Sequence, residues 1–196
     1  PSEILVIADG KSNAAYVAAD MLSQAEHDKM ASAVLVTDSM ALAEAVSAEL
    51  ERQLALLPRE EIARTSIEQN GKIIVADRLD DVIAVANEIA PEHLELCVDN
   101  PFDYLDKIEN AGSIFLGRYC PEALGDYFAG PNHTLPTSGT ARFSSPLSVD
   151  DFVKKSQYTY YTKDALGAVA DQIALFAQKE GLEAHAKSVT IRMDKA

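Results

Sequence analysis

Acidic, amide and imidazole side chains that could move protons or bind a metal ion recur at four places in the sequence. Gln24 and His27 lie three residues apart in a segment of helical periodicity, so their side chains project from one helix face. Glu92 and His93 are adjacent and follow Pro91, which turns the backbone out of the preceding helix. An adjacent carboxylate and imidazole can serve as an acid–base pair, although such neighbours are often only part of a surface turn.

Two further places lie toward the C-terminus. Asp126 belongs to the segment 125–133, which also holds two glycines, a proline and His133, a composition typical of a shaped loop. Glu180 and His185 follow the last long helix-like segment. Taken singly, each of these residues is most often a solvated surface residue. Taken together, an amide oxygen, a carboxylate and two imidazoles suit Zn²⁺ or a similar divalent ion. That candidate ligand set is Gln24, His27, Asp126 and His185.

Two nucleotide-binding motifs are disfavoured. Gly10-Lys11-Ser12 lies between a strand-like run and a helix-like segment, as in a P-loop, but that motif needs a glycine five residues before Gly10, where the chain has Leu5. No GxGxxG follows any strand-like run, so the chain carries no dinucleotide-binding fingerprint.

The elements that must position these residues alternate along the chain. Continuous apolar runs predict buried strands at 4–8, 33–36, 72–76, 94–98 and 113–116. Helical periodicity predicts helices at 12–30, 39–56, 58–70, 79–90 and 163–179, with a short helix around 101–109. The segment 118–146 is rich in Gly, Pro, Ser and Thr and predicts a long functional loop, and 188–193 predicts a short terminal strand.

This alternation favours an α/β fold: a Rossmann-like open, mostly parallel sheet with helices on both faces, plus a helical C-terminal extension. We expect residues 1–146 to form the α/β domain that carries the site, and residues 147–196 to form the extension and tail. Because Glu92 and His93 lie where a helix gives way to a strand, we expect the ligand to bind at strand ends.

The composition disfavours some classes of binding partner and favours one cellular compartment. With 17 basic and 31 acidic residues the formal charge is −14, which disfavours nucleic acid and anionic membranes as partners. The two cysteines, Cys97 and Cys120, lack CxxC spacing and favour a reducing compartment. No apolar stretch reaches the roughly 18 residues of a membrane span, and no signal peptide precedes the first strand. We therefore expect a cytoplasmic protein. The abrupt start at Pro1, without Met, predicts a chain that has been cut.

The segments around the candidate residues resemble the histidinol dehydrogenase family. The similarity covers essentially the whole chain, and its motifs follow one another in the family's order. They are 24–28 (QAEHD), 90–96 (APEHLEL), 122–127 (EALGDY), 130–144 (GPNHTLPTSGTARFS) and 180–185 (EGLEAH).

The resemblance implies a role for each residue. Gln24, His27 and Asp126 correspond to zinc ligands from one subunit, and His185 to a fourth ligand that the tail of a partner subunit delivers in a homodimer. Glu92 and His93 correspond to the catalytic acid–base residues. Substrate contacts are implied for Ser2, His133 and Glu180, and also for Gln24, His27, His93, Asp126 and His185.

The implied reaction is the oxidation of L-histidinol to L-histidine through L-histidinal, the last steps of histidine biosynthesis, with two NAD-linked oxidations. In the family, one Zn²⁺ per site grips the amino group and imidazole of the substrate, and such positioning supplies much of a rate enhancement. His93 would take the alcohol proton as hydride leaves to NAD⁺. Glu92 would then activate water to attack the aldehyde.

Family members are about twice as long as this chain, which aligns with their second half. Their first half carries another Rossmann-like domain and most NAD contacts. We therefore expect this chain to hold most of the zinc and substrate site but not to turn over alone. Three alternatives stay open: a non-catalytic zinc- or ligand-binding fragment or homologue, a zinc hydrolase with Glu92 as base on a metal-bound water, and a purely structural α/β interaction domain.

Overall fold

The computed structural model describes residues 2–193. The chain divides into two compact units, Pro1–Phe152 and Val153–Ala196. The first unit holds every strand among the described residues, and the second is helical. The domain boundary expected between residues 146 and 147 stays a prediction.

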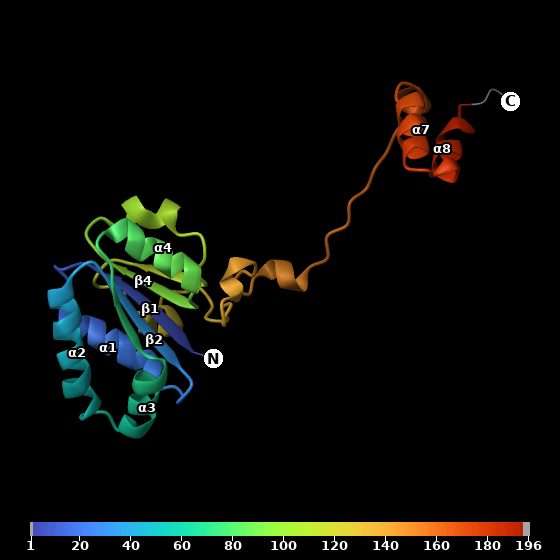
Figure 1. The fold of residues 1–196 in the computed structure, drawn as a ribbon. Helices are drawn as coiled ribbons and strands as arrows, with labels where there is room; N and C mark the ends of the chain where they lie inside the picture. Colours follow the sequence, from blue (N-terminus) through green and yellow to red (C-terminus); the bar gives the residue numbers. More distant parts are fainter. Residues whose placement is uncertain (1, 194–196) are drawn as a thin grey trace. The chain divides into compact units, whose positions relative to one another are not determined.

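A five-stranded parallel sheet forms the centre of the first unit (Figure 1). Its strands are β1 (Glu3–Ala8), β2 (Ser32–Thr37), β3 (Lys72–Val75), β4 (His93–Cys97) and β5 (Ser113–Leu116). They pair in the order β3-β2-β1-β4-β5, and every pair is parallel. This is the strand order of a Rossmann-like half, in which the chain reverses direction across the sheet between β1 and β4. The predicted fold class is confirmed.

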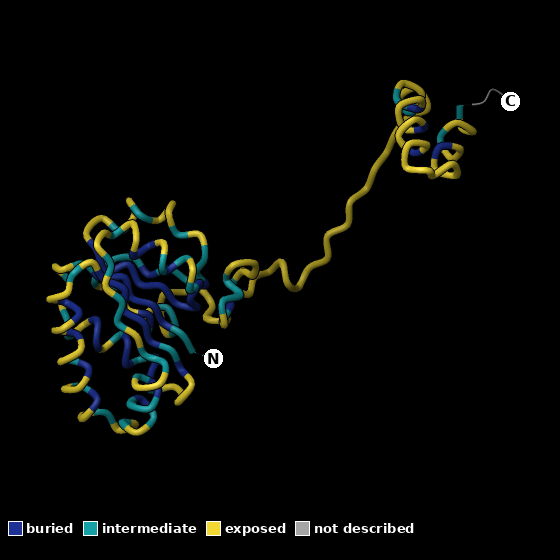
Figure 2. The backbone as a smooth tube through the Cα atoms, in the orientation of Figure 1, coloured by how far each residue is buried: buried dark blue, intermediate teal, exposed yellow. Residues whose placement is uncertain are grey.

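Helices cover both faces of this sheet. α1 (Ala14–Ala25), α2 (Met40–Leu54) and α3 (Glu60–Asn70) pack on one face, and α4 (Leu79–Ile89) packs on the other. Side chains of β1 alternate between the two cores, because successive residues of a strand point to opposite faces. Val6 packs with α1, whereas Leu5 and Ile7 pack with α4. Figure 2 shows the strands as the buried centre of this unit.

The turn that leads into β4 is backbone-strained. α4 ends at Ile89, and Ala90 adopts a left-handed conformation with φ 55° before Pro91. A non-glycine residue in that region costs free energy and persists only where its surroundings hold it. The Ala90 N–H still donates to the Ala86 carbonyl oxygen at 2.9 Å, which completes the last turn of α4. The turn therefore places Glu92 directly before β4 and His93 at its first position.

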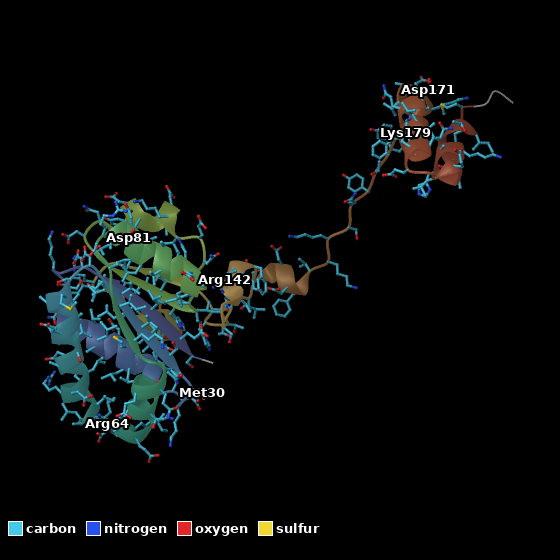
Figure 3. All side chains as sticks on the ribbon, viewed as in Figure 1. Met30, Arg64, Asp81, Arg142, Asp171 and Lys179 are labelled. Atoms are coloured by element: carbon cyan, nitrogen blue, oxygen red, sulfur yellow. The ribbon has the colours of Figure 1, made fainter. Side chains whose placement is uncertain are left out.

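The segment expected to be one long loop contains a short helix, α5 (Glu122–Tyr127). At six residues it is too short to show a periodic pattern, and tertiary contacts hold it. A Cβ atom at Gly125 would lie 2.6 Å from Cε1 of Phe115, so glycine lets α5 approach β5 closely. Beyond α5, the short 3₁₀ helix η2 (Thr140–Arg142) is tied to α4, since the Arg142 guanidinium (labelled in Figure 3) donates to the Glu88 carbonyl oxygen.

Three helices form the second unit: α6 (Lys163–Gly167), α7 (Ala170–Lys179) and α8 (Glu183–Thr190). Small side chains pack α7 against α8, namely Ala174, Ala177 and Ala186. Gly181, with φ 75°, reverses the chain between them, and the following Leu182 N–H donates to the Ala177 carbonyl oxygen at 2.8 Å. Among residues 2–193, no helix combines the length and apolar character that crossing a membrane requires.

Two expectations about this unit were wrong in detail. The helix predicted over 163–179 is interrupted at 168–169, where α6 gives way to α7. The strand predicted at 188–193 does not form, because α8 runs through Thr190 and a turn follows. No strand of the described chain pairs with this segment, so local helical bonds satisfy its backbone groups, such as Ile191 N–H to the Lys187 carbonyl oxygen at 3.1 Å.

Candidate functional site

A polar cavity of about 380 Å³ opens at the amino-terminal ends of β1 and β4. Its volume falls in the range of small-molecule sites. Seven of the nine site residues proposed from the sequence line it, together with Tyr127, which was not proposed. The lining residues are Ser2, Gln24, His27, Glu92, His93, Asp126, Tyr127 and His133.

The other two proposed residues belong to the second unit. Glu180 directly follows α7, and His185 lies in α8. Both are exposed, and both line a cavity of about 440 Å³ within that unit, next to the apolar side chains of Ile173 and Phe176. Their roles stay predictions.

Three elements each contribute a row of polar side chains to the region at and behind the first unit's cavity. The spacing is three or four residues on the helices and two on the strand, so each row shares one face of its element. The rows are Asp20, Gln24 and His27 on and just after α1; His93, Glu95 and Cys97 on β4; and Glu122 and Asp126 on α5. Potential ligand atoms of His93, Glu122 and Asp126 all lie within 4.8 Å of one another.

The main chain of one β1 residue holds both candidate proton-transfer residues. The Glu3 N–H donates to Oε2 of Glu92 at 3.1 Å, and the Glu3 carbonyl oxygen lies 2.9 Å from Nδ1 of His93. Because a carbonyl oxygen can only accept, Nδ1 must carry the hydrogen, and Nε2 of the neutral ring keeps its lone pair. The structure thus selects Nε2 as the basic nitrogen of His93.

The basic nitrogen faces a carboxyl group that sequence reasoning did not propose. Nε2 of His93 lies 3.8 Å from Oε1 of Glu122. Both atoms are buried, and neither has a hydrogen-bond partner among the residues that the structure describes. Buried polar atoms without partners are rare in folded proteins. This pair therefore marks the place where a polar group of a ligand would satisfy both atoms.

Burial sets the electrostatics of the two glutamates. It raises the pKa of Glu92, an effect that the neighbouring His93 and the Glu3 N–H partly oppose. It also raises the pKa of Glu122 to about 6, and Asp126 adds to that rise. The neighbouring Gln24 and His27 oppose this rise in the pKa of Glu122.

The donors that line the cavity fit a zinc ion. The carbonyl oxygen of Gln24, the imidazole of His27 and the carboxylate of Asp126 are N and O ligands of the kind that Zn²⁺ accepts. Three protein ligands with one open position are typical of catalytic zinc sites. Gln24 is only 2% exposed, so its amide is held in the interior beside the cavity.

The opposite end of the sheet is closed by ion pairs. Nη2 of Arg118 lies 2.6 and 2.8 Å from the two carboxylate oxygens of Asp9, and Nη1 lies 2.5 Å from Asp99. Lys11 also contacts Asp99, with Nζ 2.6 Å from its Oδ2. Rossmann-like sheets usually bind dinucleotides at this carboxyl end, between β1 and β4. In this chain the charged residues at the carboxyl end pair with one another, and the polar cavity lies at the amino ends instead.

Fold and site together define a Rossmann-like α/β domain whose polar cavity is lined by candidate acid–base and metal-ligating side chains. Comparison with known proteins names the group. The histidinol dehydrogenase family profile matches residues 1–193. The chain belongs to the histidinol dehydrogenase family.

Individual relatives agree. The chain is 61% identical to the histidinol dehydrogenase of Geobacter metallireducens over 193 residues, which are 98% of this chain and 44% of that protein. It is 58% identical to that of Bacillus cereus over 195 residues, 100% of this chain and 46% of that protein. The crystal structure of histidinol dehydrogenase from Elizabethkingia anophelis matches with a TM-score of 0.92 and 43% identity, over 98% of this chain and 44% of that one. The chain therefore spans less than half the length of these relatives.

Proposed function

We propose that this chain carries the zinc and substrate site of a histidinol dehydrogenase, the enzyme that oxidises L-histidinol to L-histidine through L-histidinal with NAD. One observation supports the proposal above the others. Gln24, His27 and Asp126, which come from distant parts of the sequence, line the same cavity as Glu92 and His93. A cytoplasmic setting is part of the proposal, in keeping with the free thiols of both cysteines.

Three residues of the first unit would hold the metal ion: Gln24, His27 and Asp126. His185 of the partner subunit would complete the set, in a homodimer that exchanges tails, and Glu180 would contact the substrate. A bound Zn²⁺ would supply positive charge that orients the amino and imidazole groups of histidinol. Ser2 and His133 line the same cavity and would make further substrate contacts.

His93 would accept the hydroxyl proton of histidinol at Nε2. Its Nδ1–H remains bonded to the Glu3 carbonyl oxygen, so the ring keeps its orientation before and after the transfer. The resulting imidazolium would be stabilised by two nearby carboxyl groups. Oε2 of Glu92 lies 3.6 Å from Nδ1, and Oε1 of Glu122 lies 3.8 Å from Nε2.

Glu92 would accept a proton from the water that attacks the aldehyde. Glu92 is only 8% exposed, and this burial raises the pKa of its carboxyl group. The carboxylate is therefore more basic, as proton transfer at neutral pH requires. The Glu3 N–H bonded to Oε2 fixes the side chain at the cavity wall.

The NAD contacts would come from the part of the family's chain that this sequence does not match. Neither a glycine fingerprint nor an open crevice between β1 and β4 provides them here, since Arg118 pairs with Asp9 at that place. We therefore expect the isolated chain to bind zinc and histidinol without producing NADH.

The test combines an activity assay with a metal titration. NADH formation from histidinol is measured for the chain alone and after mixing with the unmatched N-terminal portion of the Geobacter metallireducens relative. We expect no activity alone and activity on mixing. Zn²⁺ should bind the wild-type chain but not Asp126→Ala, whereas Asp103→Ala, an exposed aspartate in the 3₁₀ helix Pro101–Lys107, should bind normally. Equal zinc affinity of both variants would refute the proposed ligand set.

A second candidate is a zinc- and ligand-binding protein without catalysis. The observation that favours it is the 44% share of the Geobacter metallireducens enzyme that the chain covers. It predicts the same binding of zinc and histidinol, and the same effect of Asp126→Ala. It differs in the mixing assay, where no NADH should form however much of the N-terminal portion is added.

A further inference from the structure

A carboxyl group behind the cavity caps the helix that presents Asp126. Glu95 occupies the centre of β4 and is only 1% exposed. Its Oε1 accepts the backbone N–H of Glu122 at 2.8 Å. Glu122 is the first residue of α5, and the preceding residue, Pro121, makes no side-chain cap bond. The first N–H groups of a helix lack partners within the helix, so an acceptor from a neighbouring strand takes the place of the usual capping side chain.

A second acid on α1 completes the arrangement. Potential ligand atoms of Asp20, Glu95 and Cys97 lie within 4.8 Å of one another. Burial raises the pKa of Glu95 to about 9, and the nearby Asp20 adds to the rise. Burial raises the pKa of Asp20 to about 6, and a hydrogen bond from Glu95 limits that rise. At neutral pH Glu95 therefore carries a proton that its second oxygen can offer to the nearby carboxylate of Asp20, while Oε1 receives the Glu122 N–H.

We propose that Glu95 is a positioning residue that bridges α1 and α5 and so sets Glu122 and Asp126 against His93. α1 carries Gln24 and leads to His27, and α5 carries Asp126, so Glu95 joins the two elements that would supply the metal ligands. That the cavity binds zinc is part of the proposed function, and the inference rests on it. The bridge itself rests on the bond from the Glu122 N–H to Glu95 and on the closeness of the Asp20 carboxyl group.

Because Glu95 is neutral, an amide can replace its carboxyl group without a change of charge. In Glu95→Gln the amide oxygen still accepts the Glu122 N–H, and the amide nitrogen still donates to Asp20. In Glu95→Met a side chain of similar length makes neither bond. Zn²⁺ affinity, measured by titration of the metal alone into each chain, should be unchanged in Glu95→Gln. It should fall about 10- to 100-fold in Glu95→Met, as when other outer partners of metal ligands are lost.

A variant on the opposite face of β4 provides the matched control. Leu96 is buried against the α4 side of the sheet, so Leu96→Met disturbs the same strand without touching α1 or α5. Its zinc affinity should equal that of the wild type. Equal affinity of Glu95→Met and wild type would overturn the proposal. So would a loss of zinc binding in Glu95→Gln, because it would make the charged carboxylate itself a ligand.

Hydrogen exchange at the Glu122 amide keeps the proposal testable if Glu95→Met does not fold. The amide should be protected in the wild type and in Glu95→Gln, and an unprotected Glu122 amide in the wild type would overturn the bridge. This measurement also separates the two proposals. If the wild-type chain binds no Zn²⁺ but the Glu122 amide is protected, the proposed metal site fails while the bridge stands.

Discussion

The two ends of the parallel sheet differ in chemistry. At the carboxyl ends of β1 and β4, the acids and bases pair with one another: Arg118 with Asp9 and Asp99, and Lys11 with Asp99. At the amino ends, the polar groups face a cavity, and two of them, on His93 and Glu122, have no partner within the described residues. At the carboxyl ends the charges are neutralised by ion pairs, although Nε of Arg118 is buried without a hydrogen-bond partner among the described residues, whereas at the amino ends the unpartnered atoms border a cavity.

Helix polarity explains why the two ends suit different ligands. α1 connects parallel strands, so its N-terminus lies at the carboxyl end of the sheet and its C-terminus lies at the amino end. Helix N-termini favour anions such as the phosphates of dinucleotides, and helix C-termini favour cations. Gln24 lies in the last turn of α1, and no basic residue in that turn offsets the dipole. A Rossmann-like sheet can therefore place a metal ion at the end that dinucleotides do not use.

The largest expected effect is a loss of kcat on substitution at the amino end of the sheet, with none at the carboxyl end. His93→Gln should lower kcat of the chain mixed with the relative's N-terminal portion by about 10²- to 10⁴-fold, the usual contribution of a general base. Its zinc affinity should stay unchanged, because His93 is not a proposed ligand. Steady-state NADH formation and zinc titration measure the two effects. Ser12→Ala, at the opposite end, serves as control and should keep full kcat; a comparable loss there would erase the distinction.

A smaller effect should appear at the carboxyl end, in stability alone. Arg118→Met removes the ion-pair partner of Asp9, and both side chains are largely buried, at 21% and 18% exposed. Loss of charged hydrogen bonds of this kind costs about 1–3 kcal/mol. Urea unfolding should show this loss while zinc affinity is retained. Arg64→Met, at the exposed ion pairs of α3 (Figure 3), should cost less. A change in zinc affinity in Arg118→Met would contradict the independence of the two ends.

Between the ends, Glu95 should make stability depend on pH. Its folded-state pKa of about 9 lies above its ordinary value of 4.5, so its contribution to stability is complete below 4.5 and is lost as pH rises through 9. The groups facing it are Asp20 from α1, Glu122 from α5 and Cys97 on β4. Asp20 and Glu122, with pKa values of about 6, change the stability at lower pH. Cys97, whose pKa is raised, changes it only above its ordinary value of 9.0.

The difference in unfolding free energy between the wild type and Glu95→Gln at pH 6.5–8.5 therefore reports on Glu95. The wild-type chain should lose up to about 1.4 kcal/mol per pH unit, the slope for one proton. Glu95→Gln should show a nearly flat profile over this range. The conservative Asp103→Asn, at an exposed acid, should follow the wild type. Identical slopes for wild type and Glu95→Gln would mean that Glu95 is ionised in the fold.

The smallest expected effect belongs to Lys11. Its side chain is 75% exposed, so Lys11→Gln should leave the melting temperature and zinc affinity unchanged. Neither the wild type nor the variant should bind ATP or NAD⁺ at this end, and calorimetric titration checks both. Measurable nucleotide affinity that depends on Lys11 would restore the P-loop interpretation of Gly10-Lys11-Ser12.

Much of the fold could be predicted from the sequence because its strands are continuous apolar runs. The runs around Leu5, Leu35 and Leu94 could only be buried on both faces, and each forms an inner strand. The prediction of a terminal strand was wrong because the apolar residues near Ile191 fit a short helix equally well. Periodicity over so few residues does not separate a helix from a strand.

The candidate site was only partly predictable, for a physical reason. Gln24, His27, Glu92, His93 and Asp126 stand in distinctive motifs. Glu122 lies within one of those motifs but owes its place to α5, a helix held by contacts distant in sequence. Glu95 did carry a signal, because a glutamate at the centre of an apolar strand must have a buried partner. That partner, Asp20, is 75 positions away, and nothing in the spacing pairs them.

The main chain of Glu3 bonds both Glu92 and His93, so position 3 should tolerate substitution and labelling. Because peptide groups anchor Glu92 and His93, replacing the side chain at position 3 deletes neither anchor. It removes the acceptor of the Ser138 N–H and a negative charge that acts on Glu92. A fluorophore attached there would face a separate cavity, lined also by Ser138 and Arg142, and would leave the acid–base pair in register.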